Sequence, residues 1–454
     1  MDPLLGLNII DGTVLAVLAA LSLVALAYLV VRRRPRRWPS RRLREFRAQS
    51  SWSTRRWLIT VGIAAAAGAL IAVLVLWLSE GVFNVFGLPL DPDTHGWVIA
   101  AFAGIAVAVV NFPRSRWWRR TIAALSVVLF LVTATVGINA AYGMNATVAA
   151  FLNIQTGHPV AVPKPVPTPS STPTGPPKPL WQTWVAPAGM PAQGSFGTVT
   201  IPATISGFVA RPAYLYLPPA ALVKDPPALP ILIMMMGQPG GPESSALFLP
   251  TLNALAAAHH GLGPIVLTID QIGNPYKNPL CIDSSMGKVH TYVMTDVVNY
   301  VRSTLHVATG PRNWAVGGYS NGGECAMSFG GKHPDVFGSI VSISGEITPS
   351  LGSVATTIQR GFGGDRAAYT AELPLTIWAS KHYADTTAIF TVGGNDPVFG
   401  PEAAKAEAAA KAAGMTTYRF VGPGVGHRAD AVQFGVPKAI PLLYPRWNLE
   451  APTG

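Results

Sequence analysis

Long apolar segments, separated by short polar ones, make up the first third of this chain. Four of them stand out: Thr13–Val31, Leu58–Leu78, Gly96–Phe112 and Thr121–Tyr142. Each is about long enough, as a helix, to cross a hydrocarbon core of ~30 Å. None carries a charged residue in its core, which is the pattern expected of membrane spans. The sequence therefore predicts four transmembrane helices, the third of which is the shortest and could be tilted or partly interfacial.

Beyond about residue 180 the pattern changes to short apolar runs alternating with helix-forming stretches. The runs that predict buried strands are Leu229–Met236, Trp314–Gly317, Ser339–Ile343, Thr387–Val392 and Thr416–Val421. Helix-like stretches, Glu324–Phe329 and Glu402–Ala413, follow two of these runs. Strands that alternate with helices are typical of a mostly parallel sheet covered by helices. The fold class predicted for this part is therefore α/β, in a single domain large enough for a full core.

A proline-rich segment, Gly157–Pro179, separates the two parts. Such a segment favours extended polyproline II, which at ~3.1 Å per residue could span up to ~70 Å. The preferred interpretation is a disordered tether with no further role, and a spacer that lifts the catalytic domain from the bilayer is the alternative. The predicted organisation is a four-helix anchor over residues 1–145, a linker over 146–180 and a catalytic domain over 181–454.

Charge is distributed unevenly along the chain. Arg32–Arg56 holds eleven arginines and one glutamate, and Arg114–Arg120 holds four more arginines, so these loops carry fourteen net positive charges. The whole chain carries +11, which leaves the remainder negative by three. By the positive-inside rule both loops are cytoplasmic, and everything after Tyr142 lies outside. The basic composition thus reflects membrane topology and anionic lipid, and it gives no support for nucleic-acid binding.

The most informative motif is Gly318-Tyr319-Ser320-Asn321-Gly322, between a predicted strand and a predicted helix. Gly-x-Ser-x-Gly in this context is a nucleophile elbow. The turn strains the serine and exposes its hydroxyl at the carboxyl edge of the sheet, and the glycines leave room for it. Ser320 is the predicted nucleophile, and the backbone N–H of Asn321 is a predicted oxyanion donor.

The other catalytic residues follow in the chain order Ser, Asp, His that this architecture requires. Asp396 comes just after the predicted strand Thr387–Val392, and His427 lies on a glycine-rich loop after the last strand. An imidazole must take the proton of a serine hydroxyl, and a carboxylate must orient that imidazole. Glu346, after the preceding strand, is the alternative acid.

A second oxyanion donor is expected from the loop after Leu229–Met236. The loop begins Gly237-Gln238-Pro239. The backbone N–H of Gln238 is the favoured donor, and that of Gly237 is the alternative.

Two cysteines, Cys281 and Cys325, both fall in the second part. Outside the cytoplasm they form either a disulfide or two buried thiols. No cysteine or histidine spacing is typical of a metal site, so neither a metal nor a cofactor is expected.

From roughly Gly194 to Leu443 the chain resembles the esterase family that includes esterase D and the mycobacterial mycolyltransferases of the antigen complex. The residues that carry the resemblance are Gly318–Gly323, Lys332-His333-Pro334-Asp335-Val336-Phe337 and Ser342-Ile343-Ser344-Gly345. The resemblance implies an α/β-hydrolase fold and a serine carboxylester hydrolase or acyltransferase, with Ser320, Asp396 and His427 in the matching places. The mycolyltransferases usually use Glu as the acid, so Asp396 favours a hydrolase.

The complete layout is similar to actinobacterial membrane esterases, some of which are thought to cleave aminoacyl groups from phosphatidylglycerol. The sequence thus predicts an outward-facing, membrane-anchored esterase that acts on a lipid or cell-envelope ester, with the bilayer as its partner. An acyltransferase to a sugar or lipid alcohol is the alternative on the same triad. A non-catalytic membrane scaffold or a transporter would be alternatives of another class. The oligomeric state stays open.

Overall fold

The computed structural model describes residues 4–10, 12–31, 54–83, 90–113, 115–143, 145–152, 154, 157–163, 178–275 and 277–452. The chain divides into two compact units, Met1–Ile154 and Gln155–Gly454. Two predicted features, most of the first arginine-rich loop and the centre of the proline-rich linker, lie outside the described residues.

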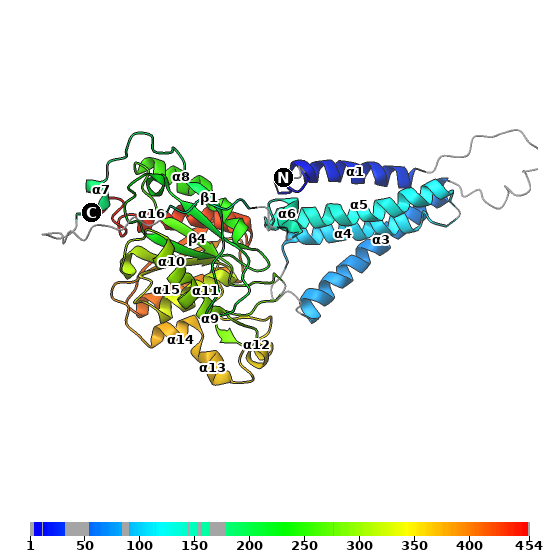
Figure 1. Ribbon diagram of the computed structural model, residues 1–454. Helices are drawn as coiled ribbons and strands as arrows, with labels where there is room; N and C mark the ends of the chain where they lie inside the picture. The colour runs from blue at the N-terminus through cyan, green and yellow to red at the C-terminus, as the bar shows by residue number, and fades with distance from the viewer. Residues whose placement is uncertain are drawn as a thin grey trace, which may run out of the picture. The chain divides into compact units, whose positions relative to one another are not determined.

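Four long helices form the first unit (Figure 1). They are α1 (Thr13–Val30), α3 (Thr54–Trp77, continued by the π-helical η2, Leu78–Val82), α4 (Pro92–Val109) and α5 (Trp117–Tyr142), followed by the short α6 (Val148–Phe151). All four are long and apolar enough to cross a membrane, which confirms the predicted number of candidate spans. Helices α3, α4 and α5 begin about one turn before their apolar segments, because polar residues can form the first turn of a helix. Asp91, for example, caps α4 by accepting the N–H of Asp93 at 3.0 Å.

Close helix contacts and one arginine hold the first unit together. Helix α4 packs against α3 and α5, and α5 packs against α1. A side chain on Gly68 of α3 would place its Cβ 2.5 Å from the carbonyl oxygen of Phe102 in α4, so a glycine is needed for this approach. Arg119, in α5, donates to the carbonyls of Leu29 at 2.6 Å and Val31 at 3.2 Å, at the end of α1. Both arginine-rich stretches therefore leave the same end of the bundle.

An eight-stranded sheet forms the centre of the second unit. Its strands are β1 (Ser195–Val199), β2 (Ala213–Leu217), β3 (Ile231–Met235), β4 (Ile265–Ile269), β7 (Trp314–Tyr319), β8 (Ser339–Ile343), β9 (Thr387–Gly393) and β10 (Thr416–Gly422). They lie in the order β1-β2-β4-β3-β7-β8-β9-β10. Strand β2 is antiparallel to both of its neighbours, and the pairings from β4 to β10 are all parallel. A separate two-stranded hairpin pairs β5 (Asp283–Ser284) with β6 (Gly287–Lys288).

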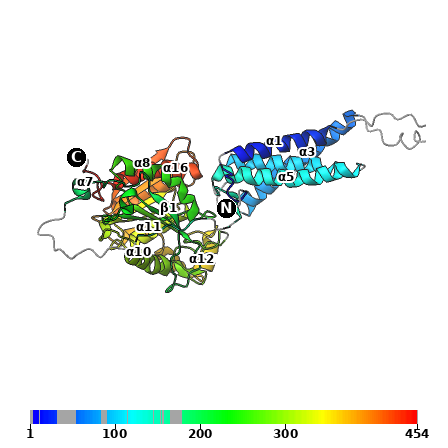
Figure 2. The ribbon, with the colours of Figure 1, turned by 45° about the horizontal axis from the view of Figure 1, so that its top comes forward.

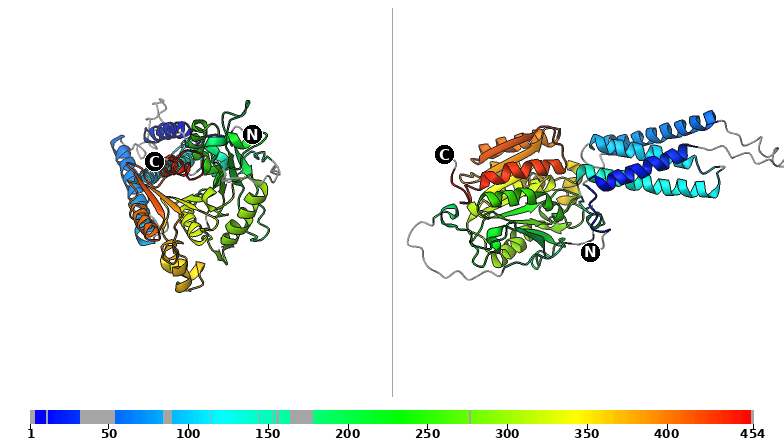
Figure 3. Two further views of the ribbon diagram at one scale, coloured as in Figure 1. Left: turned by 90° about the vertical axis from the view of Figure 1, so that its left-hand side faces the viewer. Right: turned by 90° about the horizontal axis from the view of Figure 1, so that it is seen from above.

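Helices cover both faces of this sheet (Figures 1 and 2). Helix α8 (Leu249–Ala258) packs with α16 (Ala429–Leu443), and α11 (Asn321–Lys332) packs in a row with α14 (Pro374–Ala379) and α15 (Phe399–Ala412). Figure 3 shows α15 in orange and α16 in red beside the β9–β10 side of the sheet. The remaining helices are α7 (Leu180–Thr183), α9 (Val289–Thr291), α10 (Val298–Thr304), α12 (Val354–Gly361) and α13 (Arg366–Ala371), with η3 (Pro219–Leu222), η4 (Pro242–Phe248), η5 (Tyr292–Val297) and η6 (Pro311–Asn313). This is the α/β-hydrolase fold that the sequence predicted.

The start of the predicted linker contacts the second unit. The N–H of Thr198 in β1 donates to the carbonyl of His158 at 2.9 Å, and the N–H of Val160 donates to the carbonyl of Thr198 at 3.1 Å. Because β1 is the edge strand of the sheet, its outer hydrogen-bonding groups are free to take this segment as a short partner. The structure therefore places residues 157–163 in the second unit, beside β1.

Candidate active site

Ser320 occupies the sharp turn between β7 and α11. Its φ of 54° lies in a region that a side chain rarely adopts, at a cost of about 1–3 kcal/mol. A Cβ on Gly318 would collide with the carbonyl of Gly322, and a Cβ on Gly322 would collide with the carbonyl of Met235. The two glycines of the motif are thus required by close backbone contacts on either side of the serine.

His427 links this serine to a carboxylate. Its Nε2 lies 2.9 Å from Ser320 Oγ, and its Nδ1 lies 2.8 Å from Asp396 Oδ2. The second carboxylate oxygen of Asp396 accepts the N–H of Phe399 at 2.9 Å, which fixes the carboxylate. The imidazole also stacks on two rings, with centroid distances of 5.1 Å to Tyr319 and 4.3 Å to Phe399. Packing and hydrogen bonds together hold the histidine in one orientation.

The structure brings the three predicted triad residues together. The side chain of Asp396 is 2% exposed and that of His427 is 22% exposed, so the acid is buried while the base remains accessible. A backbone hydrogen bond of 2.9 Å from Asn395 to Val425 joins the two loops that carry the acid and the base. Among the described residues, the carboxylate that contacts His427 is Asp396, whereas the alternative acid, Glu346, follows β8.

Two backbone segments flank Ser320 where the oxyanion donors are predicted. Asn321 is the first residue of α11, so its N–H lies at the positive end of the helix dipole. On the other side, a Cβ on Gly237 would lie 3.0 Å from the Cβ of Ser320, so the loop after β3 passes directly beside the nucleophile. Gln238, next in that loop, is exposed, and its side chain donates to the carbonyl of Pro275 at 3.1 Å.

Gln271 is a residue of this region that the sequence reasoning missed. It is 2% exposed, and its Nε2 donates to the carbonyl of Met236 at 2.6 Å and to Oδ1 of Asn321 at 3.1 Å. One amide therefore bridges the segment before Gly237 and the first residue of α11. The available signal was its position two residues after the apolar run Ile265–Ile269, at the carboxyl edge of the sheet.

An ion pair between Arg211 and Asp270 connects the loop after β4 to the loop after β3. Arg211 contacts both carboxylate oxygens of Asp270, at 2.9 and 3.0 Å, and donates to the carbonyl of Gly240 at 3.0 Å. Asp270 also accepts the N–H groups of Ile272 at 3.2 Å and Gly273 at 3.1 Å. The aspartate caps its own loop and, through the arginine, ties that loop to the glycine-rich loop beside Ser320.

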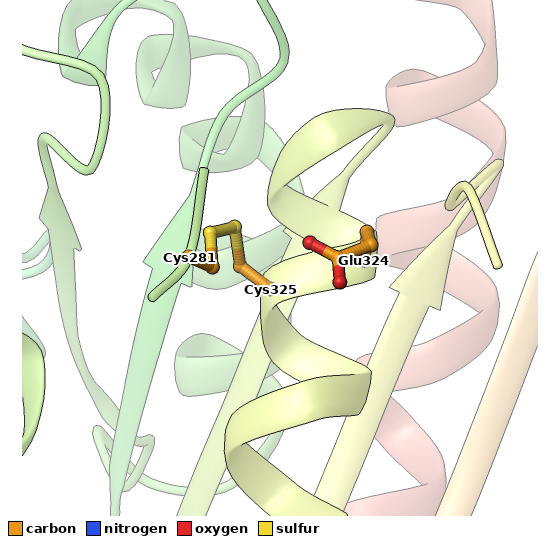
Figure 4. Close-up of side chains that lie close together, drawn as sticks. All are labelled: Cys281, Glu324 and Cys325. Atoms are coloured by element: carbon orange, nitrogen blue, oxygen red, sulfur yellow. A yellow bond between two sulfur atoms is a disulfide. The ribbon is translucent and has the colours of Figure 1, made fainter. Parts of the chain in front are cut away.

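A disulfide joins Cys281, in the loop after β4, to Cys325 in α11, with 5.4 Å between their Cα atoms (Figure 4). The carboxyl of Glu324 lies beside it, and the two sulfur atoms and a carboxyl oxygen fall within 4.8 Å of one another. Within the described part of the chain this is the group of three side chains close enough to hold a metal ion, but the disulfide occupies both sulfurs. Glu324 is 2% exposed, and its burial raises the pKa of its carboxyl to about 8.

The second unit is similar to a known protein family. Residues 212–435 match the model of the Esterase family, which is described as "Putative esterase". An uncharacterized protein of Corynebacterium glutamicum is 33% identical over 320 residues, which cover 67% of this chain and 72% of that protein.

Three solved structures illustrate what the second unit is similar to. They are an S-formylglutathione hydrolase from Agrobacterium tumefaciens (15% identity, 57% of this chain and 97% of that chain, TM-score 0.48), a ferulic acid esterase (15%, 56% and 99%, TM-score 0.47) and MPT51 (FbpC1) of Mycobacterium tuberculosis (16%, 56% and 99%, TM-score 0.42).

Proposed function

The chain belongs to the Esterase family and is a carboxylic ester hydrolase, and from this premise we propose that it is a membrane-anchored serine esterase acting outside the cytoplasm on a lipid or cell-envelope ester. The observation that carries the proposal is the continuous hydrogen-bonded chain from Ser320 Oγ through His427 to Asp396, at 2.9 and 2.8 Å. Nucleophile, base and orienting acid in this order are what ester hydrolysis through an acyl-enzyme requires.

In the proposed reaction, Ser320 Oγ attacks the ester carbonyl carbon while His427 Nε2 takes the hydroxyl proton. The negative charge on the former carbonyl oxygen is stabilised by the N–H groups of Asn321 and of Gln238 or Gly237. The ester C–O bond then breaks, and His427 returns the proton to the leaving alkoxide. Water, deprotonated by the same imidazole, then attacks the acyl carbon of the acyl-enzyme. The bond between that carbon and Ser320 Oγ breaks, His427 returns the proton to Oγ, and a carboxylic acid is released. Asp396 stays ionised throughout and holds the Nδ1–H of His427.

Support for a membrane-borne substrate comes from the first unit. Its four helices are long and apolar enough to cross a membrane, and a soluble ester would not require such an anchor. Anchoring confines the catalytic domain to a thin layer beside the membrane and raises the effective concentration of enzyme and lipid for each other. An ester lipid such as an aminoacyl-phosphatidylglycerol fits this requirement. The arginine-rich loops support an extracytoplasmic catalytic domain, because four spans bring residues after Tyr142 to the side opposite those loops.

Comparative lipid analysis tests this proposal. We expect the same ester lipid to accumulate in a strain lacking the protein and in one carrying Ser320→Ala, and to disappear when the wild-type chain is restored. Removal of the triad nucleophile leaves only a residual rate from binding and the oxyanion site, so both strains should behave alike. Accumulation in the deletion strain but not with Ser320→Ala would refute the serine mechanism. If no lipid or envelope ester changed in either strain, the substrate class would be wrong.

A further inference from the structure

Two apolar side chains project into solvent from one short turn before β2. Val209 is 85% exposed and Ile205 is 62% exposed. The backbone between them is held firmly, because the carboxylate of Asp296, itself 4% exposed, accepts the N–H groups of Ile205 and Ser206 at 3.0 Å each. A single exposed valine is common on protein surfaces, whereas two exposed apolar side chains on one anchored turn indicate a site of interaction.

The turn is rigid as well as anchored. The N–H of Gly207 donates to the carbonyl of Ala203 at 2.9 Å, and the N–H of Phe208 donates to Oγ of Ser206 at 3.1 Å. The ring of Phe208 points inward, with its centroid 5.3 Å from that of Tyr292. Phe208 is therefore partly buried against the core, whereas Ile205 and Val209, which we name the apolar tip, are exposed.

The apolar tip lies at the edge of the sheet that carries the triad. The carbonyl oxygen of Val209 is 2.7 Å from the position a Cβ on Gly273 would take. Gly273 is two residues after Gln271, whose amide contacts Asn321 next to Ser320. The turn thus borders the loop that braces the active site, at the carboxyl ends of the strands.

We propose that the apolar tip inserts into the surface of a lipid bilayer and brings the mouth of the active site to the membrane. The occupant follows from the chain itself, because the second unit is joined in sequence to four helices that are long and apolar enough to cross a membrane. No charged residue lies between Ala203 and Ala210, so inserting this segment desolvates no ion of its own. Two aliphatic side chains make a weak contact alone, but a tethered domain needs only a weak one. This inference rests on the proposed function in one respect: the proposed function supplies the ester lipid that the membrane contact would bring to the active site.

Fluorescence quenching tests the contact without reference to activity. Full-length protein in nanodiscs of phosphatidylglycerol and phosphatidylcholine would carry an environment-sensitive dye at Val209→Cys or, as the control, at Val185→Cys. Val185 is 82% exposed but follows Trp184, whose indole N–H donates at 2.9 Å to the carbonyl of His260, in the loop before β4 and hence near the opposite edge of the sheet. Nitroxide-labelled lipid should quench the dye at 209 and spare the dye at 185. Equal quenching at both positions, or none at either, overturns the proposal.

Activity on two substrates provides the second arm. The double variant Ile205→Ser with Val209→Ser should hydrolyse a soluble p-nitrophenyl ester at the wild-type rate and lose about tenfold on a fluorogenic ester lipid in vesicles. Val185→Ser should keep both rates. A quenched tip in a protein that cleaves no ester lipid would support the tip and refute the lipid substrate. Cleavage of the ester lipid by a protein whose tip is not quenched would refute the membrane contact and support the lipid substrate.

Discussion

Gln271 donates a hydrogen bond of 3.1 Å to the side chain of Asn321, and the same nitrogen donates at 2.6 Å to the carbonyl of Met236. The two acceptors belong to the two segments from which the proposed oxyanion donors come. Because the amide is 2% exposed, neither hydrogen bond competes with bulk water. The distance between the two segments is therefore fixed before any substrate binds.

Replacing Gln271 should slow the chemical step more than it weakens binding. We expect Gln271→Leu to lower kcat on a soluble chromogenic ester by about 10- to 100-fold with little change in KM, because oxyanion donors act mainly in the transition state. The exposed Gln182 provides the control, and Gln182→Leu should match the wild type. Circular dichroism and the melting temperature would check folding. A rise in KM at constant kcat would show that Gln271 binds substrate instead of positioning the oxyanion site.

The acid of the triad can be tested against its rival. Asp396→Asn should lower kcat by about 10³- to 10⁴-fold, because the amide favours the wrong tautomer of His427. Glu346→Gln should cost far less, since its carboxyl lies on the loop after β8 and the contact to His427 is made by Asp396. Steady-state rates on the same ester decide the matter. The opposite ranking would assign the acid role to Glu346.

Sequence reasoning went furthest where a residue's role is set by local chain geometry. The strands Ser339–Ile343 and Thr387–Gly393 consist of apolar and small hydroxyl-bearing residues and are buried throughout, as expected of parallel strands covered on both faces. Ser320 sits in a motif whose glycines are required by backbone contacts. Gln271 was missed because its role depends on three segments far apart in the chain, and a polar residue after a strand has no periodicity to reveal it. The pairing of Arg211 with Asp270 escaped for the same reason.

Pairing at the edge strand β1 is a second feature that the sequence did not predict. The prolines between residues 157 and 163 predict a linker, because proline has no N–H to pair in a sheet. In the structure, however, the carbonyl of His158 and the N–H of Val160 both pair with Thr198. Such pairing is decided by which groups the edge strand leaves free, and composition does not contain that information.

Glu324 should make the stability of the catalytic unit depend on pH. Burial, and next the nearby charge of Glu346, raise the pKa of its carboxyl from 4.5 to about 8 in the folded protein. Below pH 4.5 both folded and unfolded states carry the proton, and between pH 4.5 and 8 only the folded state keeps it. Stability therefore falls as pH rises through this window, by about 1.4 kcal/mol for each unit of separation between the two pKa values.

The isosteric change Glu324→Gln removes this titration. Its melting temperature should exceed that of the wild type by at least a few degrees at pH 8 and converge with it near pH 4.5. Glu407→Gln is the control, because the side chain of Glu407 is 29% exposed and forms a surface ion pair with Arg419 at 2.6 Å. Differential scanning calorimetry at several pH values gives the curves. A constant offset between variant and wild type would mean that Glu324 is not the titrating group.

The orientation of the chain is testable through the two arginine-rich stretches. Arg119 binds the carbonyls that end α1, so both stretches leave one end of the bundle, which the positive-inside rule assigns to the cytoplasm. In a Cys281→Ser, Cys325→Ser background, single cysteines at Ser50 and Ser115 should resist a membrane-impermeant maleimide in intact cells. A cysteine at Ser170 should react. Permeabilised cells supply the control, since all three should then be labelled. Protection at Ser170 together with reaction at Ser50 would place the catalytic domain in the cytoplasm and exclude an extracytoplasmic substrate.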